Sequence, residues 1–152
     1  MSHFIMTLFV HVLSAIVGVG TNITYVVLLA GAKRDQKSVI YALKTIRLLD
    51  SRLANPAYIV ALITGLILAF TVPFPITTPW ILSALILYLI IFILGIFVYT
   101  PVFRRQMHLV ENEGVESQAY QAAARLGKIL LGTVTFLAVL IVFLMVVKPV
   151  LW

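Results

Sequence analysis

The side chains that could do chemistry in this sequence gather in its first apolar segment. His11, Ser14, Gly18, Asn22 and Tyr25 follow one another in steps of three and four residues. On an α-helix this spacing places them along one stripe, and polar groups of a membrane helix tend to face other helices. The sequence therefore predicts that a reactive site in this protein includes this stripe.

His11 is the candidate for metal chemistry within the stripe. Neutral imidazole is a common ligand of haem iron, and the small Gly18 would let a flat porphyrin lie against the helix. The alternative is that His11 only forms a hydrogen bond across a helix bundle. Asn22 lies three turns further along, or about 16 Å at roughly 1.5 Å per residue, so it is a second polar site nearer the opposite membrane surface.

Lys148 and Tyr88 are the other two candidates for a cofactor site. Lys148 follows an apolar segment and precedes Trp152. It is either an interfacial anchor whose ammonium group reaches water, or a cation that pairs with a haem propionate. Tyr88 shares a helix face with Gly95 and Tyr99, and this face either packs in the core or faces a cofactor.

The elements that position these residues are membrane helices. Residues 53–103 contain no Asp, Glu, Lys or Arg and are interrupted by a Pro-Phe-Pro sequence at 73–75. A bilayer core of about 30 Å requires roughly 20 apolar residues per helix, so this run predicts two spans. With the apolar ends of the chain, the sequence predicts four spans, at about 4–32, 53–72, 77–103 and 126–150.

The composition leaves no room for a soluble domain. The chain is 62% hydrophobic with a mean hydropathy of +1.13. Its apolar runs lack the alternation of barrel strands, so the backbone must satisfy its polar groups within helices. We therefore expect residues 1–152 to form one all-α domain, an integral membrane four-helix bundle.

The basic residues predict the orientation of this bundle. Ten of the eleven lie between spans one and two or between spans three and four, and only Lys148 lies on the opposite side. The positive-inside rule places both connections in the cytoplasm and both termini outside, in a multi-pass protein of the cytoplasmic (plasma) membrane. The net charge of +6 then indicates attraction to anionic lipids at the cytoplasmic face rather than nucleic-acid binding.

Both basic connections have helical patterns of their own. Residues 39–53 alternate apolar and basic side chains at helical spacing, which predicts that span two extends into the cytoplasm as an amphipathic helix. Residues 111–114 predict a turn, and Ser117 begins a second extension that leads into span four. Asn55-Pro56 predicts an irregularity in the helix.

Several kinds of chemistry are excluded or disfavoured. The sequence has no cysteine, so disulfides, thiolate ligands and iron–sulfur clusters are excluded. The four expected spans hold no carboxylate, which disfavours a proton relay or a carboxylate cation site. His3 is expected at the outer interface and His108 in a cytoplasmic connection, so neither can join His11 on one iron within a monomer.

The segment Phe9 to Ala15 with its histidine, the glycines that follow it, and the Met-Val-Val-Lys-Pro sequence at 145–149 resemble a group of small bacterial membrane proteins. The group includes an uncharacterised four-helix family. It is distantly similar to the HemJ-type protoporphyrinogen oxidases and to CopD-like copper-resistance domains. The HemJ-type likeness implies haem binding with His11 as axial ligand, and the CopD likeness implies copper handling.

These observations predict a membrane protein that binds b-type haem or a related porphyrin for electron transfer, haem handling or porphyrin oxidation. Its site would include His11, Gly18, Asn22, Tyr88 and Lys148, with His11 as the metal ligand. Two alternatives stay open, namely a membrane subunit or scaffold without a cofactor, and a small permease that works as a homo-oligomer.

Overall fold

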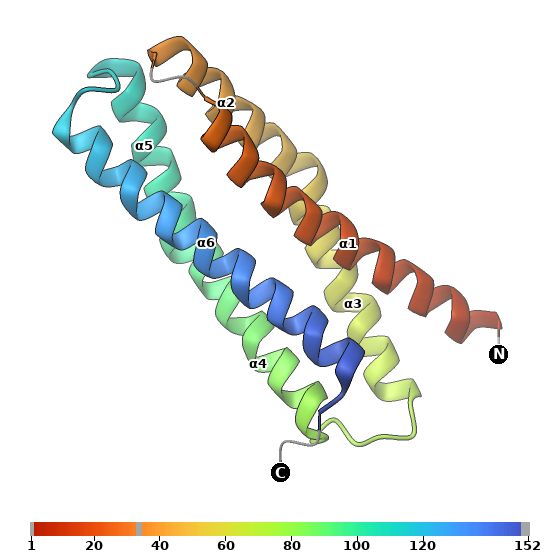
Figure 1. The fold of residues 1–152 in the computed structure, drawn as a ribbon. Coiled ribbons are helices and arrows are strands. Elements are labelled where there is room, and N and C mark those ends of the chain that lie inside the picture. Colours follow the sequence, from red (N-terminus) through yellow and green to blue (C-terminus); the bar gives the residue numbers. More distant parts are fainter. Residues whose placement is uncertain (1, 33–34, 150–152) are drawn as a thin grey trace.

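Every regular element that the computed structural model describes, over residues 2–32 and 35–149, is a helix (Figure 1). In chain order they are α1 (Ser2–Gly31), α2 (Gln36–Leu49), α3 (Asn55–Thr71), α4 (Pro79–Ile93), α5 (Thr100–Asn112) and α6 (Gln118–Val147), with π-helical segments η1 (Asp50–Ala54) and η2 (Leu94–Tyr99). The π segments join their neighbours without a break, so the described chain forms four continuous rods, each long and apolar enough to cross a bilayer. The prediction of an all-α protein with four membrane helices is confirmed.

The ends of the extensions follow from their local sequence. Asp35 caps α2 by accepting a hydrogen bond from the backbone N–H of Ser38, and Ser117 caps α6 by accepting one from Tyr120. Gly114, in the turn between α5 and α6, has a φ of +84°, which glycine adopts without steric cost. The expected turn and the expected helix start at Ser117 are therefore confirmed.

Two prolines account for the π-helical segments. Each segment ends two residues before a proline, and the backbone N–H groups of Asn55 and Thr100 bond to carbonyls five residues earlier, at Asp50 and Gly95. Proline lacks an N–H, and its ring crowds the carbonyl four residues back, so the helix widens locally. The irregularity at Asn55-Pro56 is confirmed, whereas η2 before Pro101 was not predicted.

The end of the bundle that carries the basic residues is closed by α2, α5 and the first part of α6. Their apolar faces form one core cluster of Val39, Leu43, Met107, Leu109, Val110, Tyr120 and Ala123. Lys44 Nζ lies 3.3 Å from Glu111 Oε1, and Gln36 Nε2 donates to the Val110 carbonyl at 2.7 Å. The two extensions that the sequence predicted, in α2 and at the start of α6, thus pack in one cap with α5, which was not predicted.

The outer surface of the rods is apolar. Phe70, Phe97 and Val146 have exposed fractions of 75%, 70% and 75%. Exposed apolar side chains in such number would drive association in water, whereas in a bilayer they face lipid. The protein is therefore a multi-pass integral membrane protein whose surface contacts the lipid bilayer.

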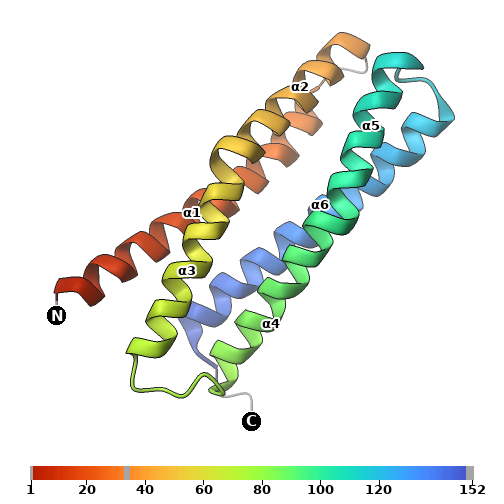
Figure 2. The same cartoon turned by 180° about the vertical axis from the view of Figure 1, so that it is seen from behind.

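The rods associate as two pairs, α1 with α3 and α4 with α6. Figures 1 and 2 show that the N-terminal part of α1 runs away from α4 and α6, so the bundle is open at this end. The tight cap and the open end leave space between the two pairs, and the candidate site lies there.

Candidate functional site

An apolar groove with a volume of about 470 Å³ separates the two helix pairs. Side chains from α1, α3, α4 and α6 line it, and many of them are small, including Ala15, Ala61, Gly65, Ala69 and Ala84. Small residues leave room between helices that larger ones would fill. The groove falls within the roughly 300–1,000 Å³ typical of small-molecule sites.

His11 is the polar side chain of α1 in the wall of this groove. Its Nδ1 atom lies 2.9 Å from the Ala61 carbonyl oxygen and 3.2 Å from the Thr64 hydroxyl oxygen, both on α3. A carbonyl only accepts, so Nδ1 carries the proton in this bond and Nε2 keeps its lone pair. Nε2 has no hydrogen-bond partner among the described residues, and no buried polar side-chain atom described is left without one, so Nε2 is not fully enclosed by the protein.

Gly65 makes room for the imidazole ring. A Cβ atom at this position would lie 2.9 Å from His11 Cε1, closer than real Cβ contacts allow. The glycine of α3 therefore fixes where the ring of α1 lies, together with the Ala61 carbonyl. Sequence analysis missed this role, because the contact depends on how α1 and α3 are aligned.

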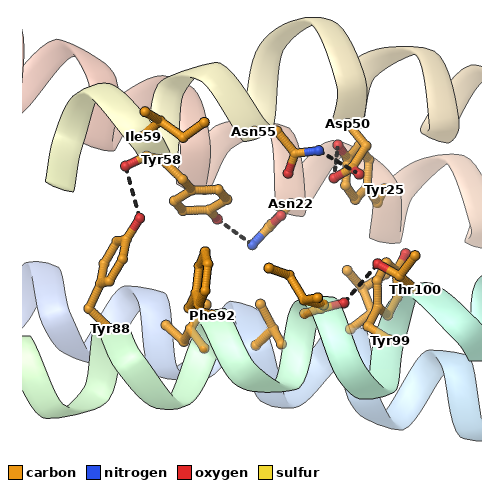
Figure 3. A pocket seen from close by; sticks show the side chains of 15 residues that line it. Asn22, Tyr25, Asp50, Asn55, Tyr58, Ile59, Tyr88, Phe92, Tyr99 and Thr100 are labelled. Carbon is orange, nitrogen blue, oxygen red and sulfur yellow. Dashed lines mark hydrogen bonds between the residues drawn. The ribbon is translucent and has the colours of Figure 1, made fainter. Parts of the chain in front are cut away.

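A second, more polar cavity of about 380 Å³ lies next to the groove on the side of the basic end. Tyr58, Tyr88 and Ile91 line both spaces, so the two are adjacent. Figure 3 shows Asp50, Asn55 and Tyr58 on one side of this cavity and Phe92, Tyr99 and Thr100 on the other. Both π-helical segments contribute to its wall.

Tyr58 connects three of the site residues that the sequence predicted. Its hydroxyl accepts a hydrogen bond from Asn22 Nδ2 at 2.7 Å and donates to the Gly18 carbonyl at 3.3 Å. The hydroxyl of Tyr88 donates to the Tyr58 carbonyl at 2.9 Å. A Cβ on Gly18 would lie 3.0 Å from the Tyr58 ring, so the small residue accommodates this tyrosine. Gly18, Asn22 and Tyr88 thus meet around a residue that sequence analysis did not single out.

Lys148 lies apart from both cavities. Its exposed side chain follows the end of α6, and Nζ lies 5.3 Å from the centre of the Trp80 ring. Lys148 lines neither the groove with His11 nor the polar cavity. A cation beside an aromatic ring at the end of a membrane helix is typical of an interfacial anchor.

Asp50 is the main residue of the polar cavity wall that sequence analysis missed. We expected span two to begin near residue 53, but the helical rod begins at Gln36 and includes Asp50 at its first π-helical segment. Its carboxylate accepts hydrogen bonds from the Tyr25 hydroxyl and from Asn55 Nδ2, both at 3.3 Å. The helical pattern over residues 39–53 continues into span two without a break. This pattern could have predicted that Asp50 belongs to the same helical rod as the span.

The chain matches, over residues 5–149, the model of a family described as predicted integral membrane protein, DUF2269. No curated protein and no solved structure matches the chain. The prediction of an uncharacterised four-helix membrane family is confirmed, and the chain belongs to the DUF2269 family of integral membrane proteins.

Proposed function

We propose that this membrane protein binds b-type haem or a related porphyrin in the apolar groove between its helix pairs, with His11 Nε2 as the axial ligand. The observation that carries the proposal is the state of the His11 ring. The Ala61 carbonyl holds Nδ1 at 2.9 Å, while Nε2 is unpartnered in a groove of about 470 Å³. A histidine whose other nitrogen donates to a carbonyl is the usual form of a metal-binding histidine.

The residues of the groove fit a porphyrin better than a bare metal ion. No group of three or more His, Cys, Asp or Glu side chains suited to an ion occurs among the described residues, whereas a porphyrin brings four nitrogen ligands of its own. The largely apolar wall suits the hydrocarbon faces of such a ring. When bound, the group would supply one-electron transfer.

Met145 of α6 is the candidate for a second side chain that would hold the group. It lines the same groove as His11, from the other helix pair, and its thioether is a known partner of histidine on haem iron. Lys148, three residues further, does not line the groove. We therefore favour Met145 over Lys148 as the second side chain that would hold the group.

The second candidate function is a membrane subunit or scaffold without a cofactor. The bond from His11 to Ala61 favours it, because this bond joins α1 to α3 and needs no cofactor to do so. A scaffold would be colourless, and His11→Gln, which can still bond to α3, would keep its assembly unchanged.

A titration with haemin separates the two functions. Detergent-purified protein is titrated while the Soret band is recorded, for the wild type, His11→Ala and the control His108→Ala, whose histidine is exposed on α5. We expect saturation near one haem per chain for the wild type and His108→Ala. We expect binding at least about tenfold weaker for His11→Ala, because even the loss of a group that only orients a metal ligand weakens metal binding by about this factor. Equal binding by all three proteins, or no saturable binding, would reject the haem proposal.

A further inference from the structure

The carboxylate of Asp50 faces the polar cavity without a cation to balance it. No Lys, Arg or His lines this cavity. The basic neighbours Arg47 and Arg52 on the same rod are exposed, and the one ion pair between described residues joins Lys44 to Glu111. The cavity wall therefore holds a half-buried carboxylate with no basic side chain beside it.

The hydrogen bonds to Asp50 do not replace a positive charge. The Tyr25 hydroxyl and the Asn55 amide satisfy its oxygen atoms, but both donors are neutral. An ionised carboxylate taken out of water is costly unless an opposite charge accompanies it. A bound cation would supply this charge.

The rest of the wall indicates what kind of cation fits. Five aromatic side chains line the cavity, those of Tyr25, Tyr58, Tyr88, Phe92 and Tyr99. Aromatic faces attract ammonium groups, most strongly where water is excluded, and rings that surround a cation are a known way to bind quaternary ammonium ions. A bare metal ion would instead seek several oxygen ligands, and Asp50 is the sole carboxylate in this wall.

The two π-helical segments bring the charge and the rings together. Asp50 is the first residue of η1 and Tyr99 is the last residue of η2, on opposite sides of the cavity (Figure 3). The Tyr99 hydroxyl has no hydrogen-bond partner among the described residues, and its ring packs beside Phe103 with centroids 5.9 Å apart. Local widening of helices is frequent at functional sites.

We propose that the cavity between η1 and η2 binds a small organic ammonium ion, with Asp50 as the counter-charge and the tyrosines as an aromatic enclosure. The volume of about 380 Å³ accommodates a ligand of this class. This site is distinct from the groove at His11, and it does not depend on haem binding.

Calorimetric titration tests the proposal with choline as the probe and 3,3-dimethyl-1-butanol, its uncharged isostere, as the matched ligand control. We expect saturable binding of choline by detergent-purified protein and none of the alcohol. His11→Ala should bind choline with the same affinity as the wild type, because His11 does not line the polar cavity. The outcome of the choline titration is therefore independent of the outcome of the haem titration.

Four variants locate the site. Asp50→Asn keeps the shape but removes the charge, and we expect choline to bind at least about tenfold more weakly. Tyr99→Leu should weaken it roughly tenfold, whereas Tyr99→Phe should bind as the wild type does because the ring stays. Glu116→Gln removes an exposed carboxylate outside the cavity and should change nothing.

Specific results would overturn the proposal. They are equal binding of choline and the alcohol, wild-type choline affinity in Asp50→Asn, and the absence of saturable choline binding. Displacement of choline by an equal concentration of sodium ion would assign the cavity to an inorganic cation and would also overturn it. If Asp50→Asn fails to fold, the comparison of Tyr99→Leu with Tyr99→Phe decides.

Discussion

At the scale of single residues, the position of the His11 ring depends on its close contact with Gly65. The ring of His11 lies where the side chain of any other residue at position 65 would be, and the Ala61 carbonyl holds its Nδ1 atom. The chemistry of the histidine is thus set by the backbone of the opposite helix rather than by its own neighbours in sequence.

The variant Gly65→Ala tests this dependence. The added methyl group must push the imidazole away from Ala61, because the contact of 2.9 Å is too short. We expect haemin affinity to fall by about tenfold or more, the range seen when groups that orient a metal ligand are lost. The control is Gly132→Ala, where an added Cβ meets nothing within 4 Å. Full haemin affinity in Gly65→Ala would show that the ring position is not fixed in this way.

Individual site residues could be predicted from the sequence only where their own helix revealed them. His11 and Asn22 stood out as polar groups at helical spacing within an apolar segment. Tyr58 did not, because tyrosine is common in such segments and its bond to Asn22 depends on the alignment of α1 with α3. Asp50 was missed because the span was expected to start after it.

At the scale of elements, the prolines at 56 and 101 shape the polar cavity. Each forces a π-helical segment, and the segments place Asp50 and Tyr99 in the cavity wall. With alanine at both positions we expect each rod to become a regular α-helix. The residues before each former π-helical segment would then rotate about the helix axis relative to the residues after it.

The double variant Pro56→Ala and Pro101→Ala is therefore expected to be more stable than the wild type but to bind choline more weakly. Alanine is about 3 kcal/mol more favourable than proline inside a helix, so we expect a higher midpoint of thermal unfolding and weaker choline binding. Pro73→Ala, in the bend between α3 and α4, is the control. An unchanged choline affinity with a raised midpoint would show that the π-helical segments do not build the site.

Most elements could be predicted from the apolar runs and their interruptions. The four rods, the amphipathic extensions and the turn before Ser117 each have a local signal, since charge, periodicity and capping residues act over a few positions. The segment η2 could not be predicted, because a proline within a helix can cause a kink, an end or a local widening. The choice among these depends on how neighbouring helices pack.

At the scale of the whole molecule, the sequence did not predict the space between the helix pairs. Apolar helices have the same composition whether they meet each other or a ligand, so the groove appears only when the rods are placed together. The tight packing of the basic end and the divergence of α1 at the other end create it (Figures 1 and 2).

The orientation of the molecule can be tested because the sequence contains no cysteine. Single cysteines replace Ser38 in α2, Glu113 in the turn after α5, and Thr77 between α3 and α4. The positive-inside rule predicts that a membrane-impermeant maleimide labels Thr77→Cys in intact cells and the other two only after permeabilisation. The opposite labelling pattern would place the basic end outside.

The measurement that tests the central claim most directly is the haem content of the purified protein. The protein is isolated from cells supplied with a haem precursor, and bound haem is quantified by the pyridine haemochromogen method for the wild type, His11→Ala and His108→Ala. We predict about one haem per chain in the wild type and in His108→Ala, and close to none in His11→Ala. A wild-type protein without haem, or haem in equal amount in all three, would contradict a porphyrin site at His11.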